Sequence, residues 1–125
     1  MFRLFDLLGR SSAIRALDDA FRASGMHPLL VPEPVKLTLI QLVKKHGHGN
    51  QLTDFAQAAR LMAYCSLGHA QFLEQHGESE AQLLELRVED ALDHGDTLDA
   101  KVILLALHSG LMSPEIADRI DLDAD

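Results

Sequence analysis

Apolar residues recur along this chain at spacings of three and four, which is the period of an amphipathic α-helix. In residues 79–94, for example, Ala81, Leu84, Val88 and Ala91 fall on one face and acidic residues occupy the other. No stretch alternates apolar and polar residues with a period of two for long enough to form a strand. The pattern therefore predicts an all-α protein.

Four of the apolar stretches end in histidine and glycine. They end at His46-Gly47, His76-Gly77, His94-Gly95 and His108-Ser109-Gly110. A glycine after the last turn adopts a left-handed conformation without a Cβ penalty, and histidine suits the negative end of the helix dipole. These short motifs predict a series of short helices that end at or near the histidines.

Start signals complete the predicted element order. Ser11 or Ser12 caps a first helix, Thr53 begins another, Ser79 with Gln82 has the spacing of a capping box, and Thr97 or Asp96 caps the next. Three prolines confine residues 26–34 to a connector. The expected helices cover residues 12–24, 34–46, 53–67, 69–76, 79–94, 98–108 and 114–120.

Together these signals predict a compact single-domain bundle of about six or seven short helices over residues 1–125. Residues 34–46 and 98–108 are the most continuously apolar, so we expect them at the centre, with Leu105 deep in the core. Residues 1–10 form an apolar N-terminal arm that ends at Gly9, and residues 121–125 form an acidic, frayed tail.

The amino-acid composition favours helix and also indicates the cellular compartment. Leucine occurs 23 times, against five isoleucines and five valines, and aromatic residues make up only 5%. Strand-favouring side chains are therefore scarce. The single cysteine, Cys65, can form no internal disulfide, and no stretch reads as a signal peptide or a membrane helix, so we expect a cytoplasmic protein.

Charge is unevenly distributed. Residues 1–50 carry seven Lys and Arg and four Asp and Glu, for +3, whereas residues 51–125 carry four and fifteen, for −11. A field of that sign repels phosphate backbones, so nucleic-acid binding is not expected. The acidic half is a solvated surface or a docking face for a basic partner.

Signatures of chemistry are missing from the sequence. It contains no nucleophile elbow, phosphate-binding loop, Glu-x-x-His or His-Glu-x-x-His motif, so we expect no catalytic residues and no cofactor. Asp90 and His94 have metal-ligand spacing on a helix, but the histidines are already explained as helix ends and no metal is expected. Cys65 reads as a buried small hydrophobe.

Three classes of function remain. The leading hypothesis is a small cytoplasmic protein-interaction or regulatory module without catalytic activity, which binds a protein partner or itself as a homodimer. The surfaces expected to make partner contacts are the apolar arm, the proline-rich connector and the acidic helix, through Phe2, Leu4, Phe5, Leu8, Glu85, Glu89 and Asp93.

The two alternatives need different structural features. A small-ligand-binding or enzymatic bundle would hold a pocket between helices, with Tyr64, His27 or His108 pointing into it. A metal-binding bundle would gather several ligands around one ion. A membrane role for the arm is disfavoured, because the arm lacks a strongly basic polar face.

Overall fold

Seven α-helices and one 3₁₀ turn follow one another in the computed structural model, which describes residues 2–124, with side chains described for residues 11–120. No strand occurs among these residues, so the predicted all-α class is confirmed. The elements are α1 (Phe2–Ala23), η1 (Pro28–Leu30), α2 (Glu33–His46), α3 (Gln51–Leu67), α4 (His69–His76), α5 (Glu78–Asp93), α6 (Leu98–His108) and α7 (Pro114–Ala124).

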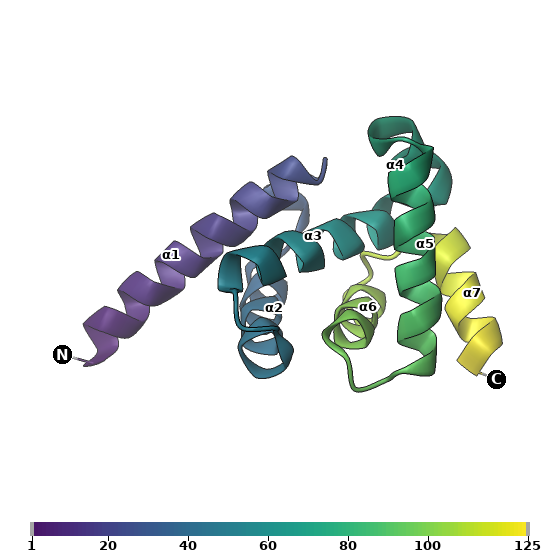
Figure 1. Ribbon diagram of the computed structural model, residues 1–125. Coiled ribbons are helices and arrows are strands. Elements are labelled where there is room, and N and C mark those ends of the chain that lie inside the picture. The colour runs from purple at the N-terminus through teal and green to yellow at the C-terminus, as the bar shows by residue number, and fades with distance from the viewer. Residues whose placement is uncertain (1, 125) are drawn as a thin grey trace.

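Helix α3 lies at the centre of the fold (Figure 1). It contacts α1, α2, α4, α5 and α6. Its buried apolar residues are Phe55, Ala58, Ala59, Leu61, Met62, Ala63, Tyr64 and Cys65. Helix α6 packs on α2, α3 and α5 with Val102 and Ala106 fully buried, but Leu105 is only partly buried, so the expectation that Leu105 lies deep in the core was wrong. Alanines on several sides of α3 let neighbouring helices approach closely, and a hydropathy pattern does not reveal that.

The N-terminal arm is not separate from the first helix. Helix α1 continues from Phe2 through Gly9 to Ala23, so the expected stop at Gly9 was wrong. A glycine inside a helix costs about 1 kcal/mol relative to alanine, which the surrounding helix-forming residues offset. Leu17 and Phe21 on the predicted stripe are buried, and Ile14 packs partly against the core.

Most of the predicted helix ends are confirmed, although the glycine adopts the expected left-handed conformation at only some of them. Helices α2, α4 and α6 end at His46, His76 and His108, and α5 ends at Asp93. Gly110 has a positive φ of 73°, as the left-handed ending requires, whereas Gly77 combines a positive φ of 93° with an extended ψ of 164°. Gly47 has a φ of −72°. A Cβ at Gly47 would collide with the Asp54 carboxylate, so close approach is the reason for glycine there.

Three helix starts differ from expectation. Ser11 and Ser12 lie inside α1, so neither caps the first helix as predicted. Asn50 caps α3 by accepting a hydrogen bond from the Thr53 N–H at 3.1 Å, so the helix begins at Gln51 rather than at Thr53. Helix α5 begins at Glu78 without a side-chain cap, so the capping box predicted from Ser79 and Gln82 is wrong.

Three other boundaries bear on the fold. Thr97 caps α6 as predicted, by accepting from the Ala100 N–H at 3.2 Å. Helix α7 begins at Pro114 as expected but runs on to Ala124.

No helix among residues 2–124 is long and apolar enough to cross a bilayer.

A buried ion pair joins α1 to α2. The Lys36 ammonium lies 2.9 Å from the Asp18 carboxylate, and Lys36 is only 8% exposed. Because an unpaired buried charge is strongly destabilising, this contact fixes the rotation of α2 against α1. In Figure 1 the end of α2 and the start of α3 lie to the left of α5 and α7.

We expect Leu61→Ala to lower the free energy of unfolding by roughly 2–5 kcal/mol, because Leu61 is fully buried in α3. Leu104→Ala removes the same atoms from a 43% exposed position in α6 and should cost clearly less. Urea unfolding of both variants measures the difference. Equal losses, or a larger loss at Leu104, would contradict the central position of α3.

Candidate protein-docking site

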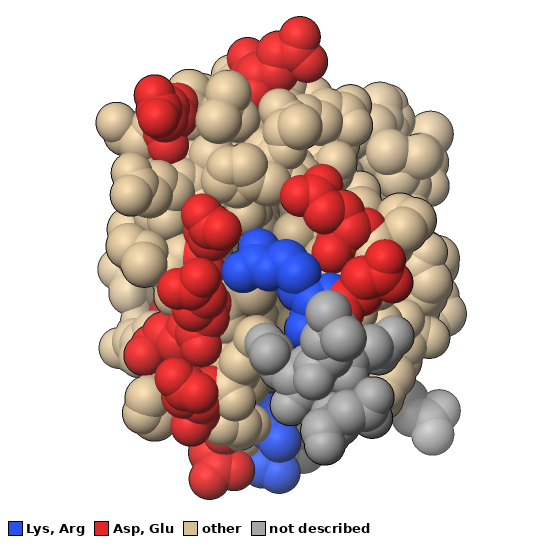
Figure 2. Space-filling view, turned by 90° about the vertical axis from the view of Figure 1, so that its right-hand side faces the viewer, with Lys and Arg blue, Asp and Glu red and all other residues tan. Residues whose placement is uncertain are grey.

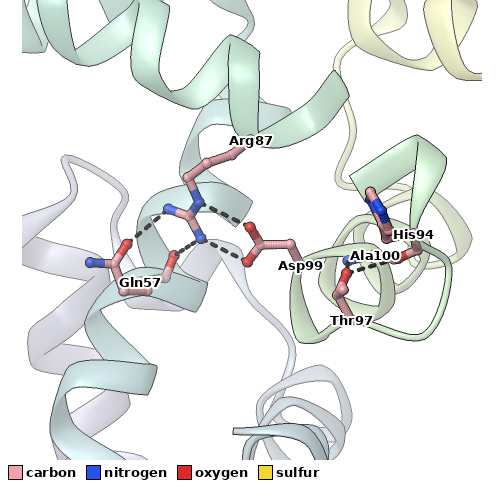
Figure 3. A network of polar contacts seen from close by, with 6 residues as sticks. All are labelled: Gln57, Arg87, His94, Thr97, Asp99 and Ala100. Atoms are coloured by element: carbon pink, nitrogen blue, oxygen red, sulfur yellow. Dashed lines mark hydrogen bonds and ion pairs between the residues drawn. The ribbon is translucent and has the colours of Figure 1, made fainter. Parts of the chain in front are cut away.

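Helices α5 and α6 are held together by one arginine. The Arg87 guanidinium donates to both Asp99 carboxylate oxygens, at 3.1 and 2.9 Å, and to the Gln57 side-chain and backbone oxygens at 3.0 and 3.2 Å (Figure 3). Arg87 comes from α5, Asp99 from α6 and Gln57 from α3. A planar guanidinium that bonds a carboxylate in this two-pronged way fixes orientation as well as distance. The network therefore sets the angle between α5 and α6.

Helix α7 is joined to α5 by a looser ion pair. Arg119 lies 3.8 Å from a Glu85 oxygen and 3.7 Å from a Glu89 oxygen. All three side chains are about a third exposed or more, so each contact adds little stability. The start of α7 is fixed more firmly, because the Ser113 N–H donates to the Cys65 carbonyl at 2.8 Å.

A groove of about 250 Å³ lies where α5, α6 and α7 meet. It is lined by Ala91, Leu92, Gly95, Ala100, Ile103, Leu104 and Ile120, and we call this set the α5–α7 groove. Every side chain in that set is apolar. An apolar hollow that opens to solvent is typical of a site that receives an apolar side chain of another molecule.

Acidic side chains surround this part of the molecule. Residues 78–120 contain ten Asp and Glu and three Lys and Arg, for a net charge of −7. Figure 2 shows that carboxylates form a column on this face and gather again across from it, with basic side chains between them. Asp93 and Asp96 are exposed and adjoin Leu92 and Gly95 of the groove in the chain. Lys101 and Arg119 adjoin Ala100 and Ile120 of the groove in the same way, so the hollow lies in a region that is acidic on balance but also carries basic side chains.

The predicted partner contacts divide into two groups. Glu89 and Asp93 are exposed on α5, and Glu85 is partly exposed, so these three lie on the acidic side of the molecule as expected. The side chains of Phe2, Leu4, Phe5 and Leu8 lie outside the described residues. The residues that line the groove were not singled out from the sequence. Leu92 and Leu104 look like ordinary core leucines in an amphipathic pattern.

The three polar residues proposed for a small-molecule pocket do not converge. Tyr64 is buried in α3, and its hydroxyl lies 2.8 Å from His69 Nδ1. Burial raises the pKa of Tyr64 to about 12, with a further rise from Glu85 and an opposing effect of Arg119. His27 is exposed and accepts a hydrogen bond from the Leu29 N–H, and His108 is exposed at the end of α6. None of them lines the α5–α7 groove.

The candidate metal pair is exposed and isolated. Asp90 Oδ1 and His94 Nδ1 lie 3.5 Å apart on the surface of α5. The hydrogen bond from the His94 ring to the Asp90 carbonyl raises the pKa of His94, as does the Asp90 charge, and protonation competes with metal binding. Within the described residues, no group of three or more His, Cys, Asp and Glu side chains is placed to hold an ion.

Cys65 is fully buried, which confirms its assignment as a small hydrophobe. Burial raises the pKa of its thiol to about 12, with Arg87 lowering and Asp99 raising that value. A thiol with so high a pKa forms little thiolate at neutral pH and is a poor nucleophile.

Comparisons with known proteins add no assignment: no protein family, no curated protein and no solved structure matches this chain.

We expect Arg87→Met to lower the free energy of unfolding by roughly 1.5–3 kcal/mol, the range for hydrogen bonds to charged groups. Arg60→Met is the matched control, because Arg60 makes one contact of 3.3 Å with Glu80 at a more exposed position. That loss should stay below about 1 kcal/mol. Urea unfolding compares the two. A loss at Arg87 no larger than at Arg60 would show that the network does not hold α5 to α6.

Cys65 should react with a thiol reagent at pH 8 only as fast as the protein unfolds, because the native thiol is both buried and protonated. Absorbance after adding Ellman's reagent measures the rate. The chain in concentrated urea is the fully reactive control. Rapid stoichiometric labelling of the folded protein would contradict the burial of Cys65.

Proposed function

We propose that this protein is a small cytoplasmic interaction module without catalytic activity, whose α5–α7 groove binds an apolar segment flanked by basic residues. The observation that carries the proposal is the groove itself, an apolar hollow of about 250 Å³ within a region of net charge −7. The single buried cysteine agrees with a reducing compartment.

The size and lining of the groove favour an apolar side chain of a partner protein, rather than a polar metabolite, as its ligand. Sites for small polar molecules place a few polar groups to fix orientation, and the side chains that line this groove offer none. An apolar side chain of a partner needs no such groups, because removal of its surface from water supplies the affinity. Leucine or phenylalanine on a partner helix has the appropriate chemistry.

The surrounding charge specifies what should flank that side chain. Asp93 and Asp96 beside the groove, and Glu89 one turn earlier on α5, make the approach favourable for lysine and arginine. Complementary charge at the rim raises the association rate and excludes acidic competitors more than it raises affinity. A basic amphipathic helix meets both requirements, because its leucines fill the groove and its lysines face the carboxylates.

We expect a synthetic helix with leucine on one face and lysine on the other to bind the protein, with an affinity that falls as salt is added. The counterpart with glutamate in place of lysine should not bind. Fluorescence anisotropy of the labelled peptides measures both.

Gly95→Trp separates groove binding from general attraction to an acidic surface. A Cβ at residue 95 meets no atom within 4 Å and Gly95 does not have a positive φ, so the backbone accepts tryptophan at this position of the groove lining, where its bulk obstructs a ligand. We expect at least about a tenfold weaker affinity for the lysine peptide, or 1.4 kcal/mol. Ala70→Trp, at an exposed position on α4, is the matched control and should bind normally. Equal affinity of all three proteins would show that the groove is not the site.

A further inference from the structure

Helix α7 is pinned to the fold at its start. The Ser113 N–H donates to the Cys65 carbonyl near the end of α3 at 2.8 Å, and Ser113 Oγ accepts from the Ile116 N–H at 3.4 Å. Gly68, between α3 and α4, lets this turn approach closely, because a Cβ there would lie 3.3 Å from Ser113 Oγ and 3.4 Å from a Glu115 carboxylate oxygen. These contacts hold the first turn of α7 against the junction of α3 and α4.

The next turn of α7, which runs beside α5 in Figure 1, is attached to α5 through one cation. Arg119 is the only basic residue in α7, and it lies 3.8 Å from a Glu85 oxygen and 3.7 Å from a Glu89 oxygen. Burial raises the pKa of Tyr64 to about 12 and Arg119 opposes that rise, so the guanidinium also lies near the Tyr64 hydroxyl of α3. Contacts of this length between partly exposed charges are weak, and salt screens them. The attachment is therefore looser here than at the start of the helix.

The groove depends on the loosely attached part of α7. Ile116 and Ile120 are 0% and 7% exposed, so both pack into the fold. Within the described residues, Ile120 is the one side chain that α7 contributes to the α5–α7 groove, whose other walls come from α5, α6 and the turn between them. Ile116 lies one turn closer to the pinned start. A rotation of α7 about Ser113 therefore moves Ile120 further than Ile116 and opens one wall of the groove.

We propose that α7 is a hinged wall of the α5–α7 groove, which pivots at Ser113, is latched to α5 by Arg119 and is held closed by a ligand in the groove. The inference rests on the proposed function, because the ligand is the one proposed there. A ligand that packs against Ile120 binds the closed form of the protein and not the open form. Its binding therefore shifts the opening equilibrium of α7 toward the closed form, and occupancy of the groove controls the position of α7.

Amide hydrogen exchange, followed residue by residue by NMR, measures the opening. An 11-residue helix is marginal by itself in water, so α7 loses its helical hydrogen bonds when it leaves α5. We expect the amides of residues 117–120 to open together, rather than progressively from the C-terminal end, and to exchange at least about a hundredfold faster than those of residues 58–62 in α3. The Ser113 amide should stay protected, because its bond to Cys65 lies at the pivot.

Arg119→Gln tests the latch. Exchange of residues 117–120 should become about threefold faster or more, as expected for the loss of partly exposed ion pairs. Arg60→Gln is the matched control and should leave α7 unchanged, because Arg60 also pairs with a glutamate of α5 and its side chain is 30% exposed, against 31% for Arg119. Salt is a second measurement if Arg119→Gln fails to fold. In the wild type, sodium chloride at about 0.5 M should accelerate exchange in α7 relative to α3.

The synthetic helix of leucine and lysine described above tests the coupling between the groove and α7. At ten times its Kd it should slow exchange of residues 117–120 about tenfold, because the bound protein cannot open. Gly95→Trp is the control, since its groove is obstructed and added peptide should leave its exchange unchanged. Fluorescence anisotropy on the same samples reports whether the peptide is bound.

Three outcomes would overturn the inference: exchange in α7 that is as slow as in α3, exchange that Arg119→Gln and salt accelerate no more than Arg60→Gln does, or a bound peptide that leaves exchange in α7 unchanged. In the third case the proposed function survives, because the groove then binds its ligand without help from α7. A peptide that does not bind the wild type at all is a different result, since the proposed function then fails and the control of α7 by a ligand fails with it.

Discussion

Alanine at positions 58, 59 and 63 lets neighbouring helices approach α3 from several sides. Five helices contact α3, and its larger residues, such as Phe55 and Leu61, fill the spaces between them. The placement of these five helices follows from this packing, because each contributes an apolar stripe to a common centre. A central helix with bulky residues all round would hold its neighbours further apart and leave voids that cost stability.

Polar contacts then fix the angles between helices, which apolar packing alone does not determine. Lys36 with Asp18 fixes α2 against α1, and Arg87 with Asp99 and Gln57 fixes α6 against α5. Lys36 is buried and Arg87 is mostly covered, so a rotation of either helix would leave a poorly solvated charge without its partner. The α5–α7 groove depends on the second of them, since two of the three helices that line it are joined there. The Arg119 contacts with Glu85 and Glu89 are exposed and long by comparison, which leaves α7 the least firmly held wall of the groove.

The two ends of the molecule differ in charge because the chain does. Residues before α3 are net basic and residues from its start onward are strongly acidic, although α2 from the first group packs directly on α6 from the second.

The sequence by itself determined the helical class, the helix ends at His46, His76 and His108, and the burial of Cys65, because helix period, end chemistry and small apolar side chains are local properties. It also located the carboxylates of α5. Tertiary structure alone decided that α3 is central, because this depends on how closely neighbouring helices can pack. It also decided that Leu92, Gly95 and Leu104 form a groove. An apolar residue in a helical pattern has the same local signature whether another helix covers it or not, and only the arrangement of α5, α6 and α7 leaves these residues at an opening.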